Sequence, residues 1–311
     1  MPLRSGTIRA VLLAFLALVV PLAGCDLGGS EEEGGTGQPP PEVIPVDQSP
    51  AWSPVGDRLA YVHDARRTED TTDVSGLYVR NLETDSTWLV IEGQVQSPDW
   101  RPDGERIAFA AGNIFTIQLD GSDLQRVTDH GSAFFPSWAP GGTRLAYDAT
   151  SLSRKGIWLV NPDGSGRKHL GLGRDPDWST QGNNLLYQGP PGSSDSGTQL
   201  WAADTSATDS TQRTNNTFVD NSDPAWSPNG KRFAWTAVTD DGSELWIMRA
   251  DGTGKQRLAG PIAGEPSWSP DSERLVFVKP DPETDHIALW TIRRDGSDLR
   301  QITSPSRNPL N

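Results

Sequence analysis

Three carboxylates occupy the same place in a short phrase that recurs along the chain. Asp175, Asp223 and Glu265 each stand directly before a proline, and a tryptophan follows that proline two residues later. Carboxylate oxygens from separate segments are the ligands that Ca²⁺ prefers, and carboxylate pairs also cleave glycosidic bonds by acid–base chemistry. If the phrase marks a structural repeat, we expect the three side chains to lie side by side on one arc.

A second acidic pair, Asp240 and Asp241, falls between two predicted strands and should extend a binding surface beside that arc. No loop has the ligand spacing of an EF-hand, and the recurrent Asp-Gly-Ser segments have the composition of tight hairpin turns. The sequence therefore predicts no cofactor. Calcium stays open as an alternative, with unknown ligands.

The motifs of several enzyme classes are missing from the sequence. It contains no Gly-x-Ser-x-Gly nucleophile elbow, no phosphate-binding loop and no Cys-x-x-Cys-His segment. The four histidines, at positions 63, 130, 169 and 286, fall in different repeats, which argues against a shared metal site. A non-enzymatic protein is favoured. The alternative is a carbohydrate-active enzyme, either a glycoside hydrolase or a lyase, that uses Asp175, Asp223 and Glu265.

Cys25, the only cysteine of the chain, ends the segment Leu22-Ala23-Gly24-Cys25. Before it, Arg4 and Arg9 precede an apolar run of about 11 residues. A run of this length suits the core of a signal peptide and is short for a membrane span. The segment matches the bacterial lipobox, in which the cysteine is acylated. We therefore predict a signal peptide over 1–24, lipidation at Cys25 and a flexible tether over 25–44.

The formal net charge of −14 bears on the possible partners. A surface of this sign repels the phosphates of DNA and RNA, so nucleic-acid binding is not expected. It attracts cations and basic partners. The predicted lipid anchor would add a membrane contact through Cys25.

The elements that position these residues follow from the repeat. Its tryptophans lie at positions 52, 100, 138, 178, 226 and 268, and this spacing of 38 to 48 residues is the period of a four-stranded propeller blade. Asp-Gly and Asn-Gly pairs between apolar segments supply the hairpin turns. The fold class predicted is all-β: a six-bladed β-propeller over 45–304, followed by a C-terminal tail over 305–311.

The repeat resembles the WD40-like (PD40) repeat of the TolB propeller family. The resemblance rests on phrases such as Pro98-Asp99-Trp100-Arg101-Pro102-Asp103-Gly104 and Arg106-Ile107-Ala108-Phe109, and it extends from about Gln48 to Thr303. It implies the propeller fold and a binding or scaffold role. The sequence departs from TolB itself, because here a predicted tether, rather than an α/β domain, precedes the first blade.

The predicted function is that of a non-enzymatic cell-envelope lipoprotein. Its propeller would bind an envelope protein or polymer, and the segments between the second and third strands of each blade vary most, as binding loops do. The longest lie at 63–76 and 189–199. We expect the lipid-anchored protein to face the periplasm or the cell exterior; which membrane holds it is left open.

Overall fold

The computed structural model of the chain describes residues 45–65, 73–150, 154–171, 173–191, 197–207, 209–215 and 219–304. The described residues all belong to one compact unit, Glu42–Asn311. The predicted signal peptide, Cys25, the tether over 25–44 and the tail over 305–311 lie outside the described residues. Within the described ranges, no helix is long and apolar enough to cross a lipid bilayer.

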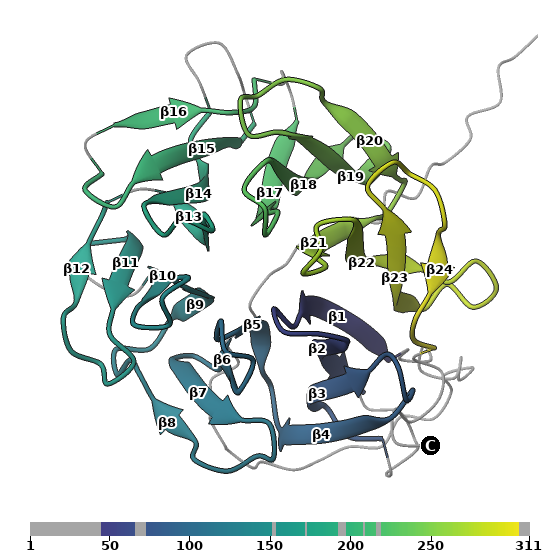
Figure 1. Cartoon of the computed structure of the whole chain (residues 1–311), viewed down its shortest axis with the longest axis horizontal. Coiled ribbons are helices and arrows are strands. Elements are labelled where there is room, and N and C mark those ends of the chain that lie inside the picture. Colours follow the sequence, from purple (N-terminus) through teal and green to yellow (C-terminus); the bar gives the residue numbers. More distant parts are fainter. Residues whose placement is uncertain are drawn as a thin grey trace, which may run out of the picture. The chain divides into compact units, whose positions relative to one another are not determined.

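The described chain forms six antiparallel sheets of four consecutive strands each, which confirms the predicted all-β six-bladed propeller (Figure 1). Blades 1 to 3 contain β1 (Val46–Trp52), β2 (Arg58–Asp64), β3 (Gly76–Asn81), β4 (Thr87–Glu92); β5 (Gln96–Trp100), β6 (Arg106–Ala110), β7 (Ile114–Gln118), β8 (Gln125–Arg126); and β9 (Ala133–Trp138), β10 (Leu145–Ala149), β11 (Gly156–Val160), β12 (Lys168–His169). Blades 4 to 6 contain β13 (Arg174–Trp178), β14 (Asn184–Gly189), β15 (Gln199–Asp204), β16 (Ser210–Gln212); β17 (Asp220–Trp226), β18 (Arg232–Thr239), β19 (Gly242–Arg249), β20 (Gln256–Ala259); and β21 (Gly264–Trp268), β22 (Arg274–Pro280), β23 (Ile287–Arg293), β24 (Arg300–Gln301).

The Asp-Gly-Ser hairpins that join the third and fourth strands are held by their own side chains. In blade 2, Asp120 Oδ1 accepts hydrogen bonds from the Ser122 backbone N–H at 2.9 Å and from its hydroxyl at 2.6 Å, and Gly121 has a φ of 79°. Blades 3 and 6 repeat this geometry. Turn formation accounts for these aspartates without a metal ion.

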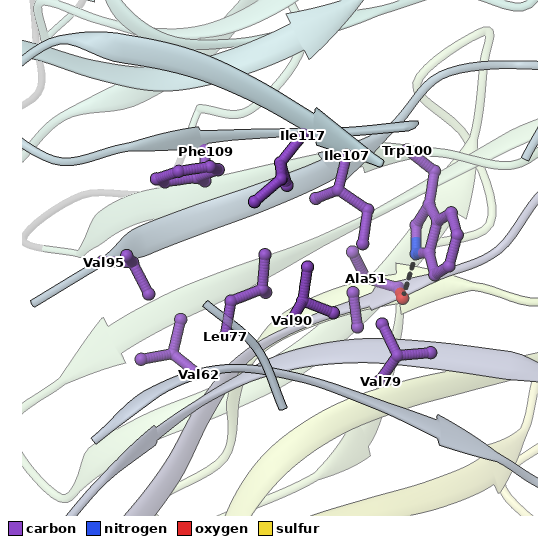
Figure 2. Close-up of a cluster of buried hydrophobic side chains, with 11 residues drawn as sticks. Ala51, Val62, Leu77, Val79, Val90, Val95, Trp100, Ile107, Phe109 and Ile117 are labelled. Atoms are coloured by element: carbon purple, nitrogen blue, oxygen red, sulfur yellow. Dashed lines mark hydrogen bonds between the residues drawn. The ribbon is translucent and has the colours of Figure 1, made fainter. Parts of the chain in front are cut away.

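The core consists of apolar side chains packed between neighbouring blades. Between blades 1 and 2, Val62 and Leu77 face Ile107 and Phe109, and the buried Trp100 ring closes one end of the cluster (Figure 2). The tryptophans of blades 2, 3, 4 and 6 are at most 6% exposed. Blade-to-blade burial of this kind is the main stabilising contribution to a propeller.

A β-bulge interrupts the innermost strand of every blade, just before the repeated tryptophan. The residue before the proline of the repeat has a positive φ between 49° and 53° in all six blades: Ser49, Ser97, Phe135, Asp175, Asp223 and Glu265. This left-handed conformation is rare for residues other than glycine. Because the innermost strands surround the propeller axis (Figure 1), the bulges place the same repeat position around that axis six times.

Candidate functional site

The three carboxylates singled out by the repeat lie in a row across blades 4, 5 and 6. Asp175 Oδ2 accepts a hydrogen bond from the backbone N–H of Asp223 at 2.8 Å. The backbone N–H of Glu265 donates to Thr236 Oγ1 of blade 5 at 3.0 Å, and the Asp223 carboxylate lies near this N–H. Glu265 Oε2 accepts the Ser49 N–H of blade 1 at 2.5 Å. Asp175 and Glu265 thus each bind the same position of the next blade, Asp223 lies near it, and we call these three residues the acidic arc.

A second row of contacts lies at the residue just before each tryptophan. Asp99 accepts the backbone N–H of Trp138 at 2.6 Å, and Asp177 accepts that of Trp226 at 2.6 Å. Serine hydroxyl oxygens are the acceptors at two other junctions. Ser137 Oγ accepts the Trp178 N–H at 3.3 Å, and Ser267 Oγ accepts the Trp52 N–H at 2.9 Å. Sequence reasoning missed this row, although Asp or Ser at this position in four of the six repeats was a readable signal.

Burial shifts the protonation of these carboxylates strongly. Their surface exposure is intermediate, but dense protein surrounds them, and desolvation raises the pKa of Asp99 and Glu265 to about 7 and that of Asp177 to about 8. Desolvation also raises the pKa values of Asp175 and Asp223, and the nearby Asp223 carboxylate adds to the shift at Asp175. With these pKa values, the carboxyl groups of Asp99, Asp177 and Glu265 are partly protonated at neutral pH.

Groups of the protein itself offset part of the charge of the acidic arc. Besides the backbone N–H groups, the positive charge of Arg174 lowers the pKa values of Asp175 and Asp223. These groups offset only part of the cost of burying the carboxylates, because the pKa values of Asp175 and Asp223 remain raised.

Asp240 and Asp241 do not join the acidic arc. Both are exposed in the hairpin between β18 and β19. The register pairs Ser222 with Thr236, so the hairpin lies four to five residues beyond Asp223, or roughly 15 Å along the strand. The pair occupies the rim of the same face of blade 5.

A buried histidine between two carboxylates is a further polar cluster, which sequence reasoning did not find. His63 Nδ1 lies 2.6 Å from Asp47 Oδ1, and its Nε2 lies 2.8 Å from Asp73 Oδ1. The His63 side chain is fully buried. Burial alone would lower its pKa, but the hydrogen bonds and charges of Asp47 and Asp73 raise it above the ordinary value. We call these residues the His63 triad.

The described part of the chain contains no preformed metal site. There, no group of three or more His, Cys, Asp or Glu side chains is arranged to hold a metal ion. The acidic arc and the His63 triad use their oxygens to accept hydrogen bonds instead. The expectation of no cofactor, with calcium as the alternative, stays untested.

A known family covers more than half of the chain. The TolB beta propeller domain, PD40, matches residues 44–222. The protein belongs to this family. The family resemblance inferred from the repeat is thereby confirmed. The matched range contains Asp99, Asp175 and Asp177, whereas Asp223 and Glu265 follow it.

Curated relatives of this TolB-type propeller match over short segments. The Tol-Pal system protein TolB of Anaeromyxobacter dehalogenans is 33% identical over 87 residues, which is 26% of this chain and 18% of that protein. TolB of Zymomonas mobilis is 32% identical over 65 residues, or 21% of this chain and 14% of that protein. The aligned segments thus span less than a fifth of either relative.

Solved structures resemble the propeller over most of its length. Acinetobacter baumannii TolB has a TM-score of 0.56 at 15% identity, covering 83% of this chain and 68% of that one. Oligogalacturonate lyase from Vibrio parahaemolyticus has a TM-score of 0.55 at 11% identity, covering 85% of this chain and 79% of that one. At these identities the likeness extends to the fold alone.

Proposed function

We propose that the protein is a lipid-anchored cell-envelope scaffold whose propeller binds a basic, partly apolar segment of another envelope protein or polymer. The binding face is the one at which the innermost strands begin. The membership in the TolB propeller family supports a binding role, and the match to TolB supports the cell envelope as its location.

The observation that carries the proposal is the composition of this face over blades 5 and 6. Exposed carboxylates flank the half-buried acidic arc there: Asp220, Asp240, Asp241, Glu283 and Asp285. Two aliphatic side chains on the same face are also exposed, Val238 by 43% and Ile262 by 40%. Acidic groups beside exposed aliphatic groups complement a segment that combines Lys or Arg with apolar residues.

Charge reversal on this face tests the proposal. The variant Asp240→Lys/Asp241→Lys should reduce the partner recovered by crosslinking in native envelopes at least tenfold at low salt, and the loss should shrink at high salt. The matched control, Glu83→Lys/Glu105→Lys, makes the same charge change at exposed residues of the opposite face. Equal losses in both variants would show that binding depends on net charge and would contradict a site on this face.

Lipid anchoring at Cys25 rests on the lipobox and has its own test. Mass spectrometry of the mature N-terminus should show acylation at Cys25, and Cys25→Ser should move the protein out of the detergent phase. An unmodified N-terminal peptide would disprove the anchor while leaving the binding proposal intact.

A carbohydrate-active enzyme is the second candidate. The raised pKa values of Asp99, Asp177 and Glu265 suit a general acid near neutral pH, and the fold is similar to that of an oligogalacturonate lyase. Incubation with oligogalacturonate should give no unsaturated product if the scaffold proposal holds. Product formation that Asp177→Asn abolishes would favour the enzyme instead.

A further inference from the structure

Within residues 45–304 as described, the propeller ring closes without a shared strand. Each described sheet consists of four strands that are consecutive in sequence, so blade 1 is built entirely by the first four and blade 6 by the last four. At the other five junctions, the chain runs directly from the outer strand of one blade into the innermost strand of the next. Between blades 1 and 6, β1 meets β21 and β22 through non-covalent contacts (Figure 1).

This seam carries both kinds of contact described above. Ser49 N–H donates to Glu265 Oε2 at 2.5 Å, and Trp52 N–H donates to Ser267 Oγ at 2.9 Å. Among the described residues, only the junction between blades 4 and 5 also has both, through Asp175 and Asp177. The apolar part of the seam brings Leu59, Tyr61 and Tyr78 of blade 1 against Val276 and Leu289 of blade 6.

The His63 triad determines where the seam can part. Asp47 belongs to β1, His63 belongs to β2, and Asp73 precedes β3. The triad therefore fastens β1 to its own blade through buried, charge-assisted hydrogen bonds, which are costly to break. Separation along the face between Ser49 and Glu265 breaks fewer such bonds than peeling β1 away from β2.

We infer that Glu265 and Ser267 form a lock that closes the ring, and that the ring opens between blades 1 and 6. At the other junctions the connecting chain keeps neighbouring blades at a high effective concentration, so a broken contact re-forms quickly. The seam has no such local connection and depends on its side-chain contacts. This inference does not depend on the proposed binding function, although opening the seam would expose the acidic arc.

Hydrogen exchange on the full chain tests the inference. The variant Glu265→Ser/Ser267→Ala gives blade 6 the Ser-Pro-Ala-Trp phrase that blade 1 already has at 49–52, so the phrase is compatible with the fold. Exchange in peptides covering β1 and β21 should accelerate at least tenfold, because a hydrogen bond to a charged group is worth roughly one to two factors of ten in an equilibrium constant.

The matched control, Asp175→Ser/Asp177→Ala, installs the same phrase in blade 4. Because the chain links blades 4 and 5, exchange in β13 and β17 should accelerate less than threefold. Equal acceleration at the two junctions would overturn the inference. Glu265→Gln, which keeps an acceptor oxygen, should retain most of the wild-type protection.

The wild-type protein provides a measurement that needs no variant. The backbone N–H groups of Ser49 and Asp223 both donate a hydrogen bond to a carboxylate oxygen. The N···O distances are 2.5 Å for Ser49 and 2.8 Å for Asp223. If the seam is where the ring opens, the Ser49 amide should exchange at least threefold faster despite its shorter bond. Equal or slower exchange at Ser49 would contradict the inference.

Discussion

The indole N–H of Trp52 donates to the Gly56 carbonyl oxygen at 3.2 Å. The indole N–H groups of the other five repeated tryptophans are placed in two ways, according to the residue before the preceding blade's tryptophan. Where that residue is alanine, the indole donates to its carbonyl oxygen: Trp100 to Ala51 at 2.9 Å and Trp268 to Ala225 at 3.0 Å. Where it is Asp or Ser, in blades 2 to 4, its side chain accepts the backbone N–H of the next blade's tryptophan instead. The indole nitrogens of Trp138, Trp178 and Trp226 are then buried with no partner among the described residues.

Two substitutions at Asp177 distinguish the effect of its hydrogen-bond acceptor from the effect of its charge. Asp177→Ala leaves the buried Trp226 N–H without an acceptor and should cost about 1–3 kcal/mol. Asp177→Asn keeps an acceptor and removes the need to bury a charge, so above pH 8 it should be neutral or stabilising. Urea unfolding at pH 8.5 distinguishes the two. A large loss from Asn would show that the charge itself holds the junction.

The His63 triad should be among the most sensitive polar positions. His63→Ala leaves Asp47 and Asp73 buried without a donor, which should lower the free energy of unfolding by about 3–5 kcal/mol. His169→Ala, at a partly exposed histidine, should cost less than about 1 kcal/mol. Similar losses in the two variants would mean that the triad contributes little beyond packing.

At the scale of the strand, the six bulges hold residues other than glycine in the left-handed region. Ser97, with a φ of 49°, pays the steric strain of that conformation. Ser97→Gly should therefore stabilise the propeller by about 0.5–1 kcal/mol in thermal or urea unfolding. Ala203→Gly, in the regular strand β15, should have the opposite sign. A destabilised Ser97→Gly would indicate that the serine makes a contact that outweighs the strain.

For the whole molecule, the raised pKa values predict an unusual dependence of stability on pH. Carboxylates with pKa values of about 7 to 8 in the fold, such as Asp99, Asp177 and Glu265, bind more protons when folded than when unfolded. Their contribution to stability is complete below about pH 4 and is lost as the pH rises toward 8. The raised pKa of His63 acts in the same direction above pH 6.5.

The melting temperature should therefore be higher at pH 5.5 than at pH 8.5. The aspartates with lowered pKa values, such as Asp120 and Asp295, are fully exposed and change protonation below this window. Asp99→Asn/Asp177→Asn should flatten the slope between pH 5.5 and 8.5. A melting temperature that stays constant or rises with pH in the wild type would rule out the raised values.

The sequence alone determined the blade count, the strand order and the place of the acidic arc. These depend on local signals, because a hairpin turn, the alternation of a strand and the repeat of a phrase all lie within one blade's length of chain. The equivalence of Asp175, Asp223 and Glu265 needed only that repetition around an axis places equal positions side by side.

Only the tertiary structure decided which groups these carboxylates meet. Ser49 and Glu265 are 216 residues apart, and Asp99 meets Trp138 across 39 residues. The His63 triad unites a strand start, a strand end and a loop. Such pairings follow from how blades stack and how a bulge turns a side chain. The Asp or Ser before the tryptophan is visible in the sequence, but the group that it binds is not. Burial likewise depends on the closed ring, so the raised pKa values belong to the assembled propeller.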